Sequence, residues 1–70
     1  MVIPAQNIKL KLARTAKQLS QQQLAERVEV TRQTISLIEQ GKYNPSLKLC
    51  ISICKALDKT LDDIFWDDSL

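Results

Sequence analysis

The stretch that decides the fold occupies residues 20–41 and reads SQQQLAERVEVTRQTISLIEQG. Ser20 is followed three residues later by Gln23, a spacing typical of the capping box that opens a helix. Thr31 is a second residue of the capping type, and Gly41 ends helices readily because it adopts the left-handed conformation without a Cβ clash. The pattern predicts two short helices, one from Gln21 to Arg27 or Val28 and one that is capped by Thr31 and continues through Gln40.

Each of these two helices has one apolar face. Leu24, Ala25 and Val28 share the face of the first, and Ile35 and Ile38 share that of the second. Helices joined by so brief a turn must cross steeply, and the small side chain of Ala25 lets their backbones approach. Residues 21–40 therefore predict a helix-turn-helix motif, whose first helix lies across the DNA backbone and whose second enters the major groove.

The opposite side of the second helix is the candidate reading surface. Arg matches the O6/N7 edge of guanine and Gln the N6/N7 edge of adenine, and each bidentate contact contributes roughly 1–3 kcal/mol of discrimination. A solvated helix start is the alternative for such residues taken in isolation. Leu37 can at most touch a thymine methyl group. The residues expected to contact bases are Arg32, Gln33, Ser36 and Leu37.

Towards the N-terminus, the chain predicts one further helix. It follows Pro4, is capped by Asn7 and continues to about Lys17. The residues expected on its inner side are Leu10 and Ala13, with Ile8 or Leu12 as further possibilities.

Towards the C-terminus, the sequence predicts two more helices. Asn44-Pro45-Ser46 is a turn whose serine caps a helix from about Leu47 to Leu57. Thr60 caps a last helix with two carboxylates in its first turn, where the helix dipole favours them. The residues expected on the core side of the longer helix are Leu47, Cys50, Ile53, Cys54 and Leu57.

The composition agrees with this helical pattern. The 70 residues allow one domain, 1–70, and 44% of them are hydrophobic, which argues against disorder. Only three residues are aromatic, whereas strands favour aromatic and β-branched residues. The predicted fold class is all-α, a compact bundle of five helices.

Charge is distributed unevenly along the chain. Residues 1–34 hold six cations and two carboxylates, whereas residues 35–70 hold four cations and six carboxylates. Such a division would orient the molecule towards a polyanion such as DNA. A randomly charged surface is the alternative interpretation.

Several other chemistries lack the residues they need. Cys50 and Cys54 cannot complete a tetrahedral zinc site in a chain without His, so packing in a reducing cytosol is the preferred interpretation. The sequence also shows no clustered carboxylates and no Gly-rich phosphate loop. Its apolar runs are too short for a membrane span or signal peptide. We expect a cytoplasmic protein that is not an enzyme and has no metal, cofactor or small-molecule ligand.

A set of residues in fixed register links the chain to a known family. They are Leu19-Ser20-Gln21, Leu24-Ala25, Val30 to Glu39, Gly41-Lys42 and Asn44-Pro45-Ser46-Leu47. Together they resemble the Cro/C1-type helix-turn-helix family, especially its short phage-repressor-like and cytolysin-repressor-like members. The resemblance runs from about Leu10 to Phe65. It implies a λ-repressor-like five-helix fold and a sequence-specific regulator of transcription that binds double-stranded DNA.

The resemblance also implies roles for residues outside the reading surface. Arg14 and Glu39 form a structural ion pair that joins the first helix to the end of the third. Contacts to phosphates fix register and supply salt-dependent affinity without reading sequence. Such contacts are implied for Gln21 and the Lys42-Tyr43-Asn44 loop, and less firmly for Gln23, Thr31 and Thr34.

Two positions depart from the family pattern. Relatives usually have Gly in the turn between the second and third helices, where this chain has Glu29, and Gln18 replaces a common Gly at the end of the first helix. If the turn keeps a positive φ, Glu29 holds about 1 kcal/mol of backbone strain.

The C-terminal segment is the candidate partner surface. Ile51, Ile64, Phe65 and Trp66 exceed what a core of this size must hold. Core completion explains Ile64 and Phe65, whereas Trp66 favours a two-fold contact, so the expected dimer interface is Ile64, Phe65 and Trp66. A dimer would read two half-sites of a palindrome about 34 Å apart. Repression is the simplest mode of regulation, and a contact to RNA polymerase is another.

One alternative belongs to a different functional class. Antitoxins that share this fold bind a toxin as well as their own operator, so the chain could be a protein-interaction module. The sequence has no long extra segment to wrap such a partner, which favours the regulator.

Overall fold

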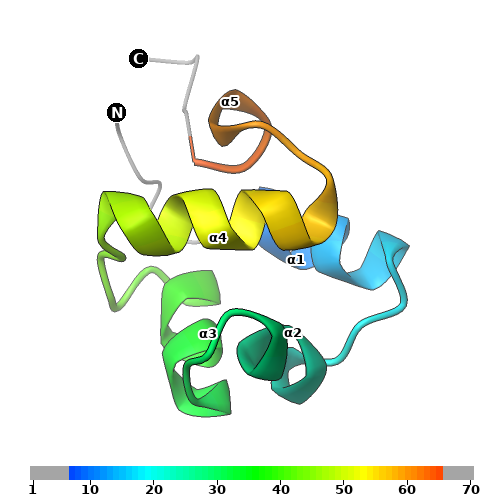
Figure 1. The fold of residues 1–70 in the computed structure, drawn as a ribbon. Helices are drawn as coiled ribbons and strands as arrows, with labels where there is room; N and C mark the ends of the chain where they lie inside the picture. The colour runs from blue at the N-terminus through cyan, green and yellow to red at the C-terminus, as the bar shows by residue number, and fades with distance from the viewer. Residues whose placement is uncertain (1–6, 66–70) are drawn as a thin grey trace.

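The computed structural model describes residues 7–65, and this part of the chain consists of five helices without a strand. The predicted all-α class and helix order are confirmed (Figure 1). The helices are α1 (Ile8–Ala16), α2 (Gln21–Arg27), α3 (Arg32–Glu39), α4 (Leu47–Leu57) and α5 (Leu61–Ile64).

Every helix begins at the capping residue that the sequence predicts. In each case a side-chain oxygen accepts a hydrogen bond from a backbone N–H of the first turn, which would otherwise lack a partner. The capping box at the start of α2 is present in full, and α5 has a second one that joins Thr60 and Asp63. The capping residues are Asn7, Ser20, Thr31, Ser46 and Thr60.

One apolar core holds the helices together. In Figure 1, α4 crosses the middle of the molecule, with α5 on one side of it and α2 and α3 on the other. Ile64 and Phe65 are 1% and 0% exposed, so their expected place in the core is confirmed. Fully buried side chains come from all five helices or their ends, and they include Leu10, Leu24, Ile35, Ile38, Cys50, Ile53, Leu57 and Phe65.

Three residues considered for the core are exposed instead. Ile8 and Leu12 are 59% and 63% exposed, because each lies two residues from the buried Leu10 and so on the other side of a helix with 3.6 residues per turn. Leu47 is 58% exposed although it shares the periodicity of α4. It opens the first turn of α4, which in Figure 1 extends past the described helices that pack on the rest of α4.

Three residues with a side chain adopt a positive φ. Gln18 has φ 58° and Glu29 has φ 62°, the two positions at which the sequence departs from the expected family pattern. Asp58, with φ 55°, ends α4 and was not expected. Left-handed backbone is unfavourable for a residue with a Cβ, so all three positions hold strain.

Candidate nucleic-acid interface

α2 and α3 form the helix-turn-helix motif. Ala25 is fully buried where the two helices approach, and its carbonyl accepts a hydrogen bond of 3.0 Å from the N–H of Val30 in the turn. Ile35 and Ile38 anchor the inner face of α3, since both are fully buried. The outer side of α3 is thereby turned to solvent.

The four predicted base-contacting residues lie on this outer side with different exposures. Arg32 and Gln33 are exposed in the first turn of α3, whereas Ser36 and Leu37 are partly buried in the second. The Ser36 hydroxyl accepts a hydrogen bond of 2.8 Å from Nε2 of Gln40. The first turn of α3 therefore holds the more accessible of the predicted base-contacting residues.

The structure contains the ion pair between α1 and the end of α3. Nε of Arg14 lies 2.7 Å from Oε2 of Glu39, and the two side chains are only 9% and 7% exposed. A second nitrogen of Arg14 donates to the Leu19 carbonyl at 2.7 Å. Arg14 thus joins α1 to α3 and also holds the connection that leads into α2.

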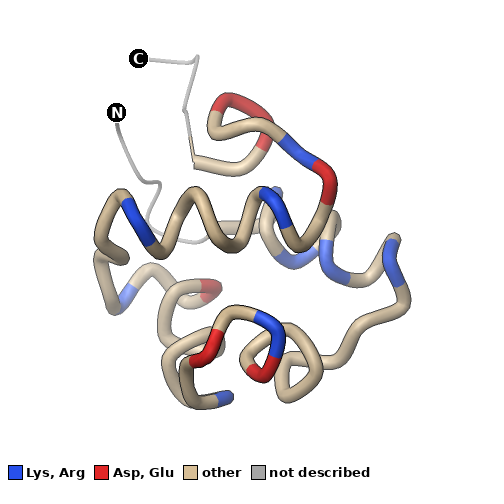
Figure 2. The backbone as a smooth tube through the Cα atoms, viewed as in Figure 1, with Lys and Arg blue, Asp and Glu red and all other residues tan. Residues whose placement is uncertain are grey.

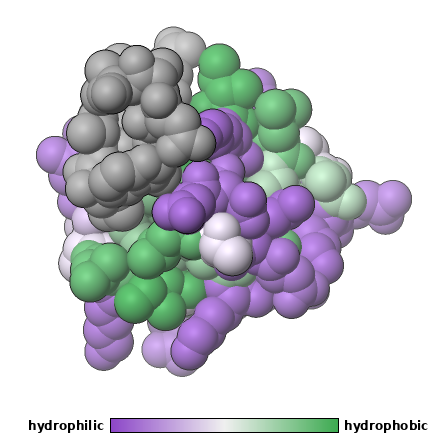
Figure 3. Space-filling model, turned by 90° about the horizontal axis from the view of Figure 1, so that it is seen from above, coloured by the Kyte–Doolittle hydropathy of each residue, from purple (hydrophilic) through white to green (hydrophobic). Residues whose placement is uncertain are grey.

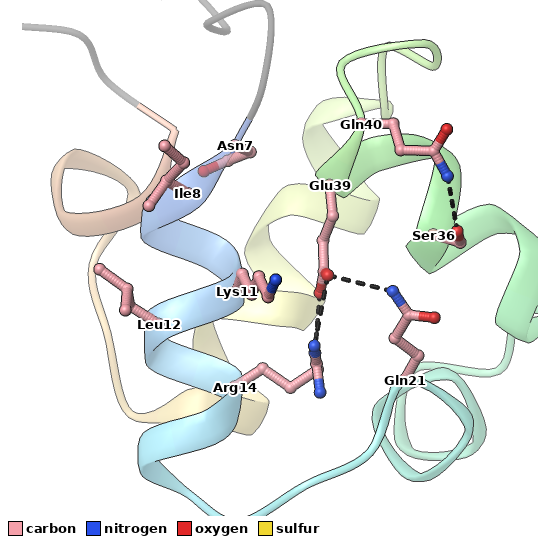
Figure 4. A pocket seen from close by; sticks show the side chains of 9 residues that line it. All are labelled: Asn7, Ile8, Lys11, Leu12, Arg14, Gln21, Ser36, Glu39 and Gln40. Carbon is pink, nitrogen blue, oxygen red and sulfur yellow. Dashed lines mark hydrogen bonds and ion pairs between the residues drawn. The ribbon is translucent and has the colours of Figure 1, made fainter.

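Gln21 extends this ion pair to the start of α3. Its Nε2 donates to Oε1 of Glu39 at 3.1 Å, and its Oε1 accepts from Arg32 at 3.4 Å. Figure 4 shows Arg14 and Gln21 converging on Glu39 from α1 and α2. We call Arg14, Glu39, Gln21 and Arg32 the polar network. Sequence reasoning assigned Gln21 to phosphate alone, because the partners lie 18 and 11 residues away and no local pattern marks them.

The remaining predicted phosphate contacts fall into two groups. Lys42, Tyr43 and Asn44 are exposed in the loop after α3, and the N–H of Lys42 donates to the Leu37 carbonyl at 2.9 Å. The second group, Gln23, Thr31 and Thr34, forms hydrogen bonds at the helix caps. Oε1 of Gln23 accepts from the Ser20 amide at 2.8 Å, and the hydroxyls of Thr31 and Thr34 lie 3.1 Å apart.

A groove runs beside the polar network, between α1 and the other two helices of this region. Gln21, Ser36 and Gln40 line it together with residues of α1. In Figure 4, Lys11 points into this groove, whereas Ile8 and Leu12 point away from Glu39. Ser36, one of the predicted base-contacting residues, lines the groove, so the groove adjoins the predicted reading surface of α3.

Basic and acidic residues are intermingled over much of the backbone trace, although α1 carries only basic ones (Figure 2). Figure 2 shows acidic residues at α5 and also in the α2–α3 region, where Glu26 and Glu29 lie among basic ones. The two halves of the sequence with opposite net charge therefore do not form two separate charged faces. Arg32 and Lys42 are exposed cations at the start of α3 and in the loop after it, and they are local features of this surface rather than part of an overall dipole.

The cysteines and carboxylates show no reactive arrangement within residues 7–65. Burial raises the pKa of the Cys50 thiol, and chiefly burial raises that of Cys54 to about 11, so both stay protonated near neutral pH. The described residues contain no group of three or more His, Cys, Asp or Glu placed to hold a metal ion. None of the described helices has the length and apolar character needed to cross a membrane.

Comparisons with known proteins agree with the geometry. A family model described as Helix-turn-helix matches residues 10–64. The HTH-type transcriptional regulator YgzD of Bacillus subtilis is 53% identical over 47 residues, which are 67% of this chain and 71% of YgzD.

Two solved structures have a similar fold. One is the restriction-modification controller protein C.AhdI of Aeromonas hydrophila, with a TM-score of 0.74 and 34% identity over 79% of this chain and 80% of that one. The other is the clp gene regulator ClgR of Corynebacterium glutamicum, with a TM-score of 0.75 and 31% identity. The match covers 79% of this chain and 58% of ClgR.

Proposed function

The chain belongs to the Cro/C1-type helix-turn-helix family of DNA-binding transcriptional regulators, which are not enzymes, and we propose that it represses transcription by binding a palindromic operator as a homodimer. The observation that carries the proposal is the exposed start of α3. Arg32 and Gln33 protrude there, while the buried Arg14–Glu39 pair and Gln21 fix the helix from behind.

In the proposed complex α3 enters the major groove with its N-terminal turn leading. Arg32 donates to O6 and N7 of guanine, and Gln33 pairs with N6 and N7 of adenine. Ser36 and Leu37 follow one turn later, where Leu37 can contact a thymine methyl group. Phosphates on either side are contacted by the Lys42–Asn44 loop and by Gln21, with lesser contributions from Gln23, Thr31 and Thr34.

We infer the homodimer from the small number of base pairs that one copy can contact. Direct readout is concentrated in a single turn of α3, so one module distinguishes only a few base pairs. Two copies related by a dyad read two half-sites about 34 Å apart and roughly double the discriminating contacts. Occupancy of an operator that overlaps a promoter is then sufficient for repression.

Selection of bound duplexes from a random DNA pool, followed by binding titrations, tests this function. A palindromic consensus is expected. Arg32→Ala should weaken binding to it by about 1–3 kcal/mol and relax the preference at one base pair of each half-site. Lys42→Ala should instead weaken binding to all sequences and reduce the salt slope by about 1.

Lys59→Ala is the matched charge control, since Lys59 lies between α4 and α5 and outside the candidate interface. It should leave affinity and preference nearly unchanged. Failure to recover any consensus, or an unchanged base preference in Arg32→Ala, would overturn the assignment. A reporter driven by a promoter that overlaps the selected operator distinguishes repression from activation.

A further inference from the structure

Two of the three residues expected in the dimer interface belong to the core. Ile64 and Phe65 are buried within the protomer, so they have almost no area to offer a second copy. Trp66, the third, lies outside the described residues. It begins the segment 66–70, which also contains two aspartates and is therefore both apolar and acidic. A surface that suits this segment must combine exposed apolar groups with cations.

The exposed side of α1 has this combination. Ile8 and Leu12 are 59% and 63% exposed, and their spacing of four residues puts them on one face of the helix. Lys9 and Lys11 are also exposed, and at 3.6 residues per turn they flank this apolar pair, one on each side. α1 contains no acidic residue. We call the four residues Ile8, Lys9, Lys11 and Leu12 the α1 stripe.

The α1 stripe lies close to the point where the described chain ends. α5 packs against α1, and the hollow between them is lined by Lys9 and Leu12 of α1 and by Asp63 of α5. In Figure 4, Ile8 and Leu12 point toward the side of α1 on which α5 lies. Trp66 comes three residues after Asp63 in the sequence. The chain therefore leaves α5 beside the α1 stripe.

We propose that residues 66–70 dock on the α1 stripe of the same molecule, with Trp66 over Ile8 and Leu12 and the two aspartates beside the lysines. The segment is long enough, because five extended residues span about 17 Å and the nine residues of α1 only about 14 Å. A buried tryptophan side chain removes about 150–250 Å² from solvent, so Trp66 can cover much of the exposed apolar pair.

Charge favours this occupant over the other segment that lies outside the described residues. Residues 1–6 include Met1, Val2 and Ile3, which suit the apolar pair, but they contain no carboxylate. The aspartates of residues 66–70 supply charges opposite to those of the lysines. Exposed ion pairs are weak and are screened by salt, so the apolar contact should supply most of the affinity and the charges the preference.

Docking also affects the surface proposed to bind DNA, a consequence that rests on the proposed function. Lys11 belongs to the α1 stripe and points into the groove that Gln21 and Ser36 line (Figure 4). Carboxylates beside Lys11 reduce the positive potential that this side presents to phosphates. Release of the segment should therefore raise the affinity for duplexes of any sequence and leave the base preference unchanged.

Trp66 is the only tryptophan of the chain, so its fluorescence reports on the segment directly. In the original protein we expect blue-shifted emission and slow quenching by acrylamide. Ile8→Ser/Leu12→Ser should shift the emission and raise the quenching to the values of N-acetyltryptophanamide, a free model compound. Figure 3, seen from the side of α5, shows hydrophobic surface in separate places among hydrophilic residues. Leu47→Ser/Ile51→Ser alters another exposed pair of the same spacing, on α4, and should change neither readout. Circular dichroism and thermal unfolding verify that each variant is folded.

The charged part of the contact is tested separately. Asp67→Asn/Asp68→Asn should raise the quenching of Trp66 by less than the loss of the apolar pair does. At about 1 M salt, where the Debye length is about 3 Å, the original protein should be quenched like this variant. On a random-sequence duplex at low salt, Ile8→Ser/Leu12→Ser should bind more tightly than the original protein, although it changes no charge.

Three outcomes would overturn the inference. Emission of the original protein that already matches the free compound means that Trp66 is not docked, and emission unchanged in Ile8→Ser/Leu12→Ser places it on another surface. Quenching that depends on protein concentration means that the segment docks on a second copy. These readouts do not involve DNA, so they stand even if the proposed function fails. An unchanged affinity for DNA in a variant whose Trp66 has become exposed overturns only the effect on DNA.

Discussion

The α1–α3 region and the α4–α5 region share one apolar core, but the α1–α3 region also contains the polar network. Between α1 and α3 the polar network links side chains far apart in sequence, through distances of 2.7, 3.1 and 3.4 Å. In α4 and α5 the main interaction is apolar burial, with Ile53, Leu57 and Phe65 fully buried. Hydrogen bonds have strict geometry, whereas the hydrophobic effect is non-directional.

This difference separates two tasks. The polar network specifies where the start of α3 lies relative to the rest of the molecule, and thus the direction in which Arg32 and Gln33 protrude. Burial in α4 and α5 supplies stability and tolerates small changes of orientation. We therefore expect substitutions in the two regions to divide between DNA preference and free energy of unfolding.

The largest effect is expected at Glu39. Glu39→Ala leaves Arg14 as a nearly buried charge without its partner, a change that typically lowers the free energy of unfolding by about 3–5 kcal/mol. It also releases Gln21. Chemical denaturation should show the loss of stability, and Glu39→Gln, which keeps the shape and an accepting oxygen, should lose less. Equal stability of Glu39→Ala and the original protein would show that the polar network does not hold α3.

Leu57→Ala tests the other side of the comparison. Leu57 is fully buried, and removing such a side chain typically lowers the free energy of unfolding by about 2–5 kcal/mol. Because Leu57 lies on α4 and all the proposed base contacts lie on α3, the folded fraction should keep the original order of preference among selected duplexes. Competition binding below the melting temperature measures that order. A changed order would mean that α4 also orients α3.

The sequence predicts local features of the chain better than it predicts contacts between residues far apart in sequence. Helix ends depend on local residues, so all five caps follow from patterns a few residues long. The positive φ of Glu29 was considered only because the family pattern has Gly there. The Arg14–Glu39 pair was expected only through the family resemblance. The bonds of Gln21 were missed, because glutamine is an ordinary first-turn residue and its partners are set by tertiary structure.

Exposure was the least predictable property. The periodicity of α4 places Leu47 inside, yet periodicity does not tell where neighbouring helices stop, and the first turn of α4 has none over it. The sequence predicted a base contact for Ser36 but not its hydrogen bond with Gln40, because that bond depends on the rotamers of both side chains.

The link between Gln21 and Arg32 can be measured by a double-mutant cycle. If Gln21 positions the guanidinium, Gln21→Ala should lower the discrimination that Arg32 provides, and the two substitutions should be non-additive by about 0.5–1 kcal/mol. The readout is binding to the selected duplex and to one changed at the base pair that Arg32 reads. Gln22→Ala, one residue along α2, is the control. Strict additivity would reduce Gln21 to a phosphate contact.

Glu29→Gly is expected to stabilise the turn between α2 and α3. Relief of the strain at φ 62° should contribute about 1 kcal/mol, partly offset by the greater freedom of Gly in the unfolded chain. Glu29→Ala keeps the Cβ and should give no such gain, so thermal unfolding of the pair isolates the backbone effect. DNA preference should stay the same, because Glu29 lies outside the proposed base contacts. A gain of the same size in Glu29→Ala would point to its charge instead.

The smallest effect concerns acid and the cap of α5. Within the capping box, hydrogen bonds with the backbone N–H and with the side chain of Thr60 lower the pKa of Asp63 from its ordinary value of 3.8. A carboxyl whose pKa is lower in the folded state stabilises fully above its unfolded pKa and loses that contribution as pH falls through the folded value. The stability difference between the original chain and Asp63→Asn should therefore be largest near neutral pH and shrink below about pH 4. Asp62→Asn, in the same turn but outside the capping box, is the control for the helix dipole. A difference that stays constant with pH would show that ionisation of Asp63 does not contribute to the stability of the cap.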